Sequence, residues 1–457
     1  GTAARVAATV GIMVYLIGYV GINLLTLGKA LHPMLGWPVF TGAAVACVLV
    51  TLYVFAGGQT SVIMTDLAQG VILLIVGLGI FLAGVLHFGG FVDFWSLLPR
   101  GHRFIFSEFN HPDKFSFIGI YVQDGLANTG AFVLMNQGMI MRFLALRSVK
   151  DAQKMAVCWV LVLAPIAAIA VSSGGWLARA LVENGELQTS AEDSFVRAAA
   201  FLCSPGIFGF VLAALMAALM STADTLINAV SAIFVTDIYQ PYIKKGAGDK
   251  HYLLIARIAA LSTAGLGLAL VPVFAEGSIY AAHGAFTAAV TPPIVVAVFL
   301  GVMWKRFNAP AALATLLGGA VLVGASFAWP EPLLKPISFG MGPDAFKFTR
   351  ALYGLIVSGV LGVGVALVTK PQPFGRIVGL VSGTQLDAMR VYKGGELNRT
   401  PGKNAHATVC EDSELEQVED ALVPQDALDT MLAQVGDLVY VCDRRWWFGG
   451  LRSVHTK

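Results

Sequence analysis

Charged residues are scarce in this chain of 457 residues, and their scarcity decides its class. Only 13% of the residues are Asp, Glu, Lys or Arg, against about 25% in typical soluble domains. Hydrophobic residues make up 56%, and the mean hydropathy is +0.73. No block of Lys and Arg of the kind that binds nucleic acid is present. We therefore expect an integral membrane protein without a nucleic-acid partner.

Cysteine pairs and the common catalytic motifs are lacking as well. The five cysteines form no CxxC pair, so the sequence suggests neither a zinc site nor a disulfide framework. A Walker loop, a paired set of metal ligands and a Ser-His-Asp grouping are also missing. The sequence therefore predicts a protein that is not an enzyme.

Apolar segments are what the sequence has in abundance. Ten of them are long enough to cross a bilayer as a helix, which takes roughly 20 residues. They cover residues 6–30, 38–56, 60–87, 117–143, 155–181, 206–236, 252–274, 278–303, 309–329 and 347–369. We expect an all-α polytopic transmembrane domain over residues 1–370 and a polar C-terminal segment over residues 371–457.

The positions of Lys and Arg predict the orientation of these spans. Three short connections are the most basic, and they lie within residues 142–154, 244–250 and 305–306. They alternate correctly for ten spans if all three are cytoplasmic. We therefore expect a multi-pass protein of the inner (plasma) membrane whose N-terminal residues and C-terminal segment are cytoplasmic.

The sixth span contains neighbouring hydroxyl groups. Ser221 and Thr222 are adjacent, and Thr225 and Asn228 follow Ser221 at i+4 and i+7, on one helix face. Hydroxyl and carbonyl oxygens suit a hard cation such as sodium. Small and hydroxyl residues also let membrane helices approach closely, so these residues alone leave ion binding and packing both open.

Two other spans contain carboxylates or amides. The third span holds Thr65, Asp66 and Gln69, and the fourth holds Gln123, Asp124, Asn128, Asn136 and Gln137. A carboxylate inside a span costs about 3 kcal/mol on insertion scales, so Asp66 and Asp124 need a partner, a proton or an interfacial position. Gly125 and Gly130 flank Asn128. They indicate either a broken helix that lines a cavity or close helix crossings.

Four short motifs follow one another between residues 57 and 306. They are Gly57-Gly58 to Thr65-Asp66 and Gln69, Asn136-Gln137 to Arg142, Ser221-Thr222 to Asp237-Ile238-Tyr239, and Pro292-Pro293 to Trp304-Lys305-Arg306. In type, order and spacing they resemble the motifs of the sodium:solute symporter family, whose members carry sugars, proline, pantothenate, iodide or monocarboxylates. The resemblance covers about residues 1–370. It implies the inverted-repeat fold of the leucine transporter and sodium-coupled symport by alternating access.

The same resemblance implies which helices the chain holds. The ten spans match core helices 3 to 10 of the fold and two C-terminal helices. Core helices 1 and 2 are then expected to be absent. Because core helix 1 supplies part of the sodium site and of the solute pocket in this family, we expect a truncated or incompletely recovered gene product that holds half of the site.

The resemblance also implies a sodium site. Its ligands correspond to the backbone carbonyl of Ala218 and the hydroxyls of Ser221 and Thr222, and Asp66 matches an aspartate on the cytoplasmic path to that site. Members that bind a second sodium use a serine one turn before the hydroxyl pair, a position that Ala218 occupies here. We therefore expect one sodium ion per solute.

The solute is less well determined. The expected solute-binding residues are Asn128, Asn136, Gln137 and Thr287. The Asn-Gln pair matches the branch of sugar, iodide, vitamin and monocarboxylate symporters, but glutamines of the sugar symporters correspond to Gly284 and Thr287. We expect a small organic solute or anion, with sugar as one option. His283 is expected to pack or to face the pore rather than to bind.

The C-terminal segment changes composition. Residues 411–420 are acidic, whereas 438–442 and 451–455 are typical of two strands around an aromatic turn. We expect a small β-rich cytoplasmic module that regulates the transporter or binds an unidentified partner. The alternative for this segment is a poorly folded tail. The alternatives to sodium-coupled symport for the whole protein are a solute sensor that signals through this segment and a proton-coupled carrier in which Asp66 titrates.

Overall fold

The structure, a computed structural model, covers most of the chain. It describes residues 2–103, 121–135, 140, 143, 146, 149–276, 278–340, 342–343, 346–385, 387–388, 402–403, 405–406, 423–435, 437, 439–441 and 454–456. Helices dominate these residues, as expected in lipid, where a helix satisfies every backbone polar group internally.

The long helices are α1 (Thr2–Leu35), α2 (Val39–His87), α9 (Ala164–Glu183), α11 (Pro205–Ile233), α12 (Asp249–Phe274), α13 (Ile279–Met303) and α17 (Phe346–Val368). The short helices are α3 (Phe91–Leu97), α4 (Arg100–Arg103), α6 (Thr129–Met135), α8 (Val149–Cys158), α10 (Ser194–Leu202), α14 (Ala309–Leu313), α15 (Gly319–Ala328), α16 (Pro330–Leu334), α18 (Phe374–Ile377) and α20 (Gln425–Met431). Segments of π-helix are η1 (Tyr121–Asn128), η2 (Trp159–Leu163), η3 (Phe234–Ile243) and η4 (Ala314–Gly318), and η5 (Lys335–Ile337) is a 3₁₀ turn.

Nine helical segments of the described chain are long and apolar enough to cross a membrane. They correspond to nine of the ten expected spans, which confirms an all-α polytopic membrane protein. The remaining expected span, residues 117–143, is described only over η1 and α6.

A sharp bend divides α2 into two spans. Gly58 has φ 57° and ψ −150°, a left-handed conformation inside an otherwise helical segment, and glycine adopts it at little steric cost. The bend separates Val39–Gly58 from Val62–His87. Gly125 and Gly130 have no positive φ. The sequence allows either a broken helix or close helix crossings at these two glycines. Within residues 121–135 the chain passes directly from π-helix to α-helix.

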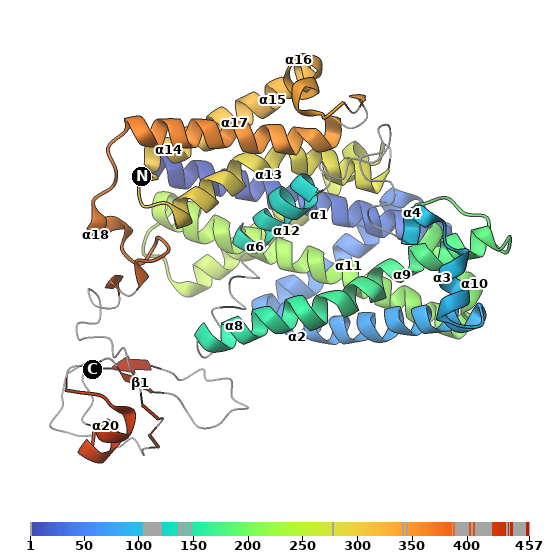
Figure 1. The fold of residues 1–457 in the computed structure, drawn as a ribbon, viewed down its shortest axis with the longest axis horizontal. Coiled ribbons are helices and arrows are strands. Elements are labelled where there is room, and N and C mark those ends of the chain that lie inside the picture. The colour runs from blue at the N-terminus through green and yellow to red at the C-terminus, as the bar shows by residue number, and fades with distance from the viewer. Residues whose placement is uncertain are drawn as a thin grey trace.

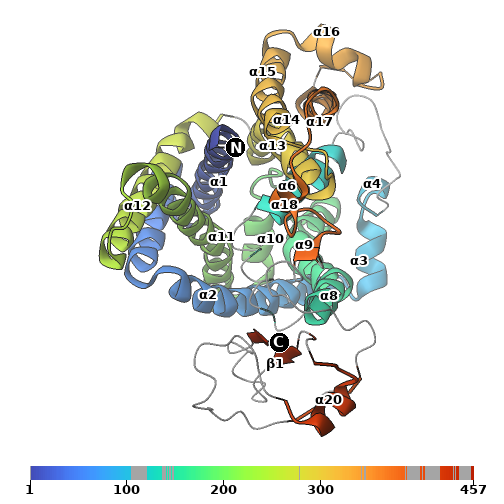
Figure 2. The ribbon, with the colours of Figure 1, turned by 90° about the vertical axis from the view of Figure 1, so that its left-hand side faces the viewer.

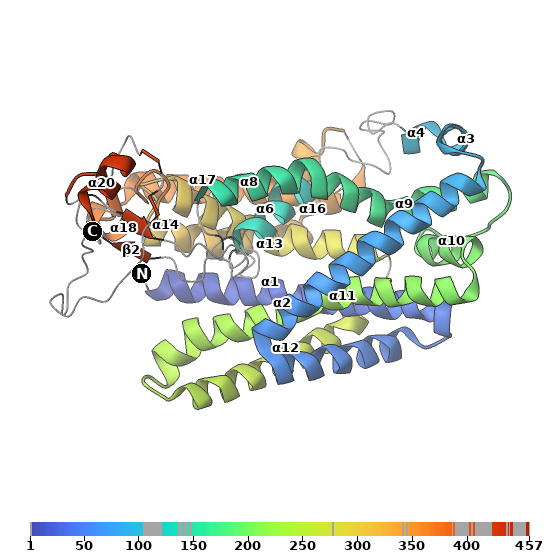
Figure 3. The ribbon, with the colours of Figure 1, turned by 90° about the horizontal axis from the view of Figure 1, so that it is seen from below.

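Four helices form one packed group. Helices α1, α2, α11 and α12 all contact one another, and they lie together in Figures 2 and 3. Their shared core includes Leu24, Val50, Ile227 and Ala264. Close crossings need small residues: a Cβ on Gly21 of α1 would lie 3.0 Å from the carbonyl oxygen of Gly267 on α12.

A second group lies along the other side of α1. Helix α13 packs on α17 and on η1, and α15 packs on α17, at the top of Figure 1. Helix α9 packs on α2 and α10. Helix α1 of the first group also contacts α13, so it joins the two groups.

The described part of the C-terminal segment begins against the membrane helices. The backbone N–H of Ser382 donates to the carbonyl oxygen of Val302 at the end of α13 (2.7 Å), and Val378 and Val381 are buried. Strands β1 (Val439–Val441) and β2 (Val454–Thr456) pair antiparallel, where the sequence predicts two strands. The acidic stretch 411–420 lies outside the described residues.

Both ends of the described chain lie at the same end of the bundle, as Figures 1 and 3 show for the start of α1 and for α18. An ion pair of 2.5 Å joins Arg5 Nη2 to Asp237 Oδ1 and so brings η3 to this face. Arg306 donates to the carbonyl oxygens of Ala366 and Leu367. Two of the three basic connections therefore lie at the end of the bundle where the C-terminal segment begins.

Candidate functional site

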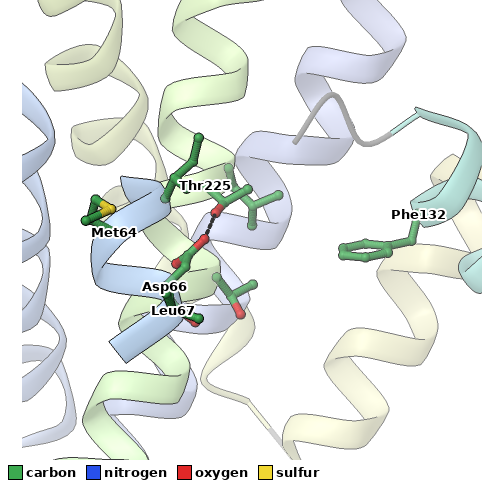
Figure 4. Close-up of a pocket in the computed structure, with 9 residues that line it drawn as sticks. Met64, Asp66, Leu67, Phe132 and Thr225 are labelled. Atoms are coloured by element: carbon green, nitrogen blue, oxygen red, sulfur yellow. Dashed lines mark hydrogen bonds between the residues drawn. The ribbon is translucent and has the colours of Figure 1, made fainter. Parts of the chain in front are cut away.

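A cavity of about 560 Å³ lies between α2 and α11. Its lining residues are Ile63, Met64, Asp66, Leu67, Phe132, Ser221, Thr222, Thr225 and Leu226. Figure 4 shows Asp66 and Thr225 pointing toward each other, with Phe132 of α6 on the opposite side. The structure thus brings three of the four expected sodium-site residues to one cavity. Asn228, expected on the same helix face, does not line it.

The two neighbouring hydroxyls both donate to their own helix. Ser221 Oγ lies 2.9 Å and Thr222 Oγ1 lies 3.4 Å from the carbonyl oxygen of Ala218. A hydroxyl has one proton and two lone pairs, so these bonds leave both oxygens able to accept a cation from the cavity. They also occupy the Ala218 carbonyl, which is not part of the cavity wall.

A second carboxylate lies behind the first. Asp224 of α11 is fully buried, and Tyr53 of α2 donates its hydroxyl proton to Asp224 Oδ2 at 2.5 Å. Thr225 Oγ1 lies 3.3 Å from Asp66 Oδ2 and 3.3 Å from Asp224 Oδ1. Because Thr225 has a single hydroxyl proton, it satisfies one carboxylate at a time. Two carboxylates joined through one hydroxyl favour a positive charge beside them.

Sequence reasoning missed Asp224 and Tyr53. Asp224 is a carboxylate in the middle of an apolar span, the same signal that singled out Asp66, and it was available in the sequence. Tyr53 gave no signal, because its partner lies 171 residues away in the chain.

A second polar cluster joins α1, η1 and α13. The Tyr19 hydroxyl lies 2.6 Å from His283 Nε2 and 3.1 Å from Asn128 Oδ1, and Asn128 Nδ2 lies 3.5 Å from the same His283 nitrogen. Tyr15 also donates to Asn128 Oδ1. His283, which the sequence predicts to pack or to face the pore, lies in a hydrogen-bonded network with Tyr19 and Asn128.

The cluster continues along α13 through Gln123 of η1. This side chain is fully buried, and Gln123 Nε2 donates to Thr287 Oγ1 at 3.2 Å. Its Oε1 atom is enclosed and has no hydrogen-bond partner in the described part of the chain. Tyr280 donates to Asp124 Oδ2 at 3.1 Å, so the Asp124 carboxylate has the partner that its position requires. A buried acceptor without a donor is costly.

The expected solute residues fall into two sets. Asn128 and Thr287 both belong to the polar cluster, whereas Asn136 and Gln137 lie outside the described residues. None of the cluster residues lines the α2–α11 cavity. The described chain therefore holds two separate polar sites, one rich in carboxylates and hydroxyls and the other rich in amides and phenols.

Comparison with known proteins decides the family. A sequence model of the Sodium:solute symporter family matches residues 2–319. The chain belongs to this family. It is a transporter and not an enzyme, its coupling ion is sodium, and its function is sodium-coupled symport of a small solute.

Relatives within the family carry different solutes. The high-affinity proline transporter PutP of Bacillus subtilis is 26% identical over 345 residues, which cover 74% of this chain and 70% of the relative. The Sodium/glucose cotransporter of Vibrio parahaemolyticus is 27% identical over 322 residues, which cover 65% and 59%. Similar identities to both leave the solute of this symporter open.

The fold is that of a solved symporter. The structure of a Na+-coupled sialic acid symporter in a substrate-bound outward-open state matches with a TM-score of 0.63 and 18% identity. The match covers 81% of this chain and 75% of the solved one. This confirms the expected leucine-transporter-like architecture.

The buried Asp224 generates a prediction about sodium affinity. We expect Asp224→Asn to raise the sodium concentration for half-maximal stabilisation roughly tenfold, because a charge several ångströms away contributes on the order of 1–3 kcal/mol. The measurement is the thermal unfolding midpoint of the purified protein against NaCl, with KCl holding the ionic strength constant.

Two variants serve as controls for this prediction. Tyr53→Phe removes the donor but keeps the charge, so we expect lower stability and a sodium affinity within about threefold of the starting protein. Tyr353→Phe removes a buried hydroxyl outside the cavity and should leave the sodium affinity unchanged. An unchanged affinity in Asp224→Asn would show that the second carboxylate does not act on the ion.

Proposed function

We propose that sodium binds in the α2–α11 cavity, held by the hydroxyls of Ser221 and Thr222 and attracted by Asp66. The observation that supports this assignment is the convergence of these side chains on one cavity from two helices. Oxygen ligands and a nearby carboxylate are what a hard cation prefers. Ala218 completes the expected set only if its carbonyl releases the hydroxyl protons that it accepts here. One sodium ion accompanies each solute molecule.

We propose further that the solute binds at the polar cluster of η1, α1 and α13. Asn128, Thr287 and the enclosed Gln123 Oε1 supply hydrogen-bonding groups there, and Asn136 and Gln137 follow η1 and α6 in the chain. The position that matches a glutamine of sugar symporters is Gly284 here. A Cβ at that position would lie 3.1 Å from Gln123 Nε2, so an amide from η1 occupies this space. A small organic solute that hydrogen-bonds with amides and phenols fits these groups.

The distribution of Lys and Arg supports an orientation of the protein in the membrane. The protein lies in the inner (plasma) membrane, and the face with Arg5, the η3–α12 connection and the start of the C-terminal segment is cytoplasmic, because Lys and Arg concentrate there. Residues 371–457 form a cytoplasmic segment that begins against the end of α13 and contains the β1–β2 pair. Its contact with α13, which also carries the proposed solute site, supports a regulatory role.

The sodium assignment predicts a loss of coupling. Replacing Ser221 and Thr222 together by Ala removes two oxygen ligands, and we expect sodium-driven uptake to be abolished. The measurement is uptake into proteoliposomes, with and without a sodium gradient, of a panel holding proline, glucose, myo-inositol and small carboxylates.

Thr263→Ala is the matched control for that experiment. Thr263 also donates to the carbonyl four residues earlier, Ala259 (2.8 Å), but it lies in α12 outside the cavity. Its uptake should keep the full sodium dependence. If the double variant transports with an unchanged sodium dependence, the cavity is not the sodium site. Uptake driven by a proton gradient alone would favour a proton-coupled carrier.

The solute assignment predicts a different signature. Asn128→Ala removes the amide oxygen that contacts Tyr19 and the amide nitrogen that contacts His283. We therefore expect the solute concentration for half-maximal uptake to rise about tenfold or more. The sodium affinity measured by thermal unfolding should change less than twofold. Asn184→Ala, an exposed amide after α9, is the control. A shift in sodium affinity with no shift for the solute would contradict the assignment of the two sites.

The C-terminal segment can be tested in the full chain. If residues 423–456 belong to a folded module, limited proteolysis in detergent will leave a resistant fragment that contains β1 and β2, identified by mass spectrometry. Rapid loss of this part of the chain to small peptides, while the membrane helices persist, would reject the module.

A further inference from the structure

Arg257 is a cation inside a membrane span that has no anion in the described part of the chain. Its guanidinium carbon lies 5.0 Å from the centre of the Phe55 ring on α2. Its Nε atom is enclosed and lacks a hydrogen-bond partner. A cation–π contact offsets only part of the cost of a charge within a span, so the guanidinium needs a further partner.

The depth of Arg257 narrows the kind of partner. It lies eight residues after Asp249, the first residue of α12, which places its Cα about 12 Å along a helix of about 39 Å. The hydrocarbon layer is about 30 Å thick, so Arg257 enters it by roughly 8 Å. A side chain as long as arginine reaches back from there to the lipid headgroups.

The residues around Arg257 face lipid. Leu253 and Leu254 on one side and Ile258 and Leu261 on the other have about half of their surface exposed, and Phe55 is also exposed. Helix α12 lies at the periphery of the molecule beside α1 and α2 (Figure 2). A soluble anion would have to approach through this apolar surface, whereas a phospholipid is already there.

Positive charge continues from Arg257 toward the end of α12. Lys250 lies seven residues earlier, on the same helix face, and Lys244 and Lys245 precede it. Between residues 244 and 257 the only acidic residue is Asp249. The connection is held in place by Tyr252, whose hydroxyl donates to the Lys244 carbonyl oxygen and accepts from the Ala247 N–H. The basic groups are therefore presented from an ordered backbone.

We propose that Arg257 and Lys250, with Phe55 beneath the guanidinium, bind the phosphate of an anionic phospholipid at this face of the membrane. A guanidinium matches phosphate oxygens with two parallel hydrogen bonds, and basic residues between membrane helices attract anionic headgroups. The acidic stretch 411–420 of the same chain and free phosphate are the competing occupants.

The test is native mass spectrometry of the full chain in detergent, titrated with phosphatidylglycerol or phosphatidylcholine. We expect phosphatidylglycerol to bind in preference. Arg257→Gln and Lys250→Gln should each weaken it about fivefold, the effect of one basic group near the surface. Arg257→Lys keeps the charge and should retain most of the binding. Lys335→Gln, which removes an exposed cation after α16, should have no effect.

Three results would overturn the proposal. The first is equal binding of the two lipids by the starting protein, or equal losses in Arg257→Gln and Lys335→Gln. The second is thermal stabilisation by inorganic phosphate in detergent that matches the effect of phosphatidylglycerol and is lost in Arg257→Gln. The third is a rise in lipid binding when the six acidic residues of 411–420 are neutralised, which would show that this stretch occupies the site. If Arg257→Gln does not fold, Lys250→Gln and Arg257→Lys decide.

Discussion

The Thr225 hydroxyl is the contact that links the two carboxylates beside the α2–α11 cavity, where we propose that sodium binds. It stands between Asp66 of α2 and Asp224 of α11 and can satisfy only one of them. A carboxylate inside a bilayer is costly unless it has partners. Tyr53 also donates to Asp224 from the side of α2, and Asp66 lies on the wall of the cavity. An ion bound there would neutralise charge on both helices at once.

The two polar sites are linked through α1, which carries part of the second site and packs against both helices of the first. The carboxylates and hydroxyls belong to α2 and α11, and the amides and phenols belong to η1, α13 and α1. Helix α1 packs against α2, α11 and α13, so a change in either group alters its surroundings. Coupling of sodium to solute requires that each ligand favours the same arrangement, and each then raises the affinity for the other. The membrane potential adds about 2.3 kcal/mol per charge per 100 mV.

The sequence predicted the fold well because helices in lipid satisfy their own backbone, and apolar length alone then marks each span. Ser221, Thr222 and Asp66 could be found because oxygen is expensive in such spans. What could not be predicted are pairings between helices: Tyr53 with Asp224, or His283 with Tyr19, which are 264 residues apart. The break at Gly58 lies between two of the predicted spans, 38–56 and 60–87, so the sequence located it, although hydropathy does not give the backbone conformation of such a link. The rule applied to Asp66 would have found Asp224.

The hydrogen bonds of Ser221 and Thr222 bear on which atoms ligate the ion. Donation to a backbone carbonyl does not remove a hydroxyl from a cation site, because a cation takes lone pairs and the proton must point elsewhere. The consequence falls on Ala218, whose carbonyl oxygen accepts both protons and is turned into the helix rather than toward the cavity. For Ala218 to ligate sodium, both hydroxyls would have to rotate and find other acceptors. In the proposed site, the Ser221 and Thr222 hydroxyls line the cavity and can accept a cation while they keep their hydrogen bonds to Ala218.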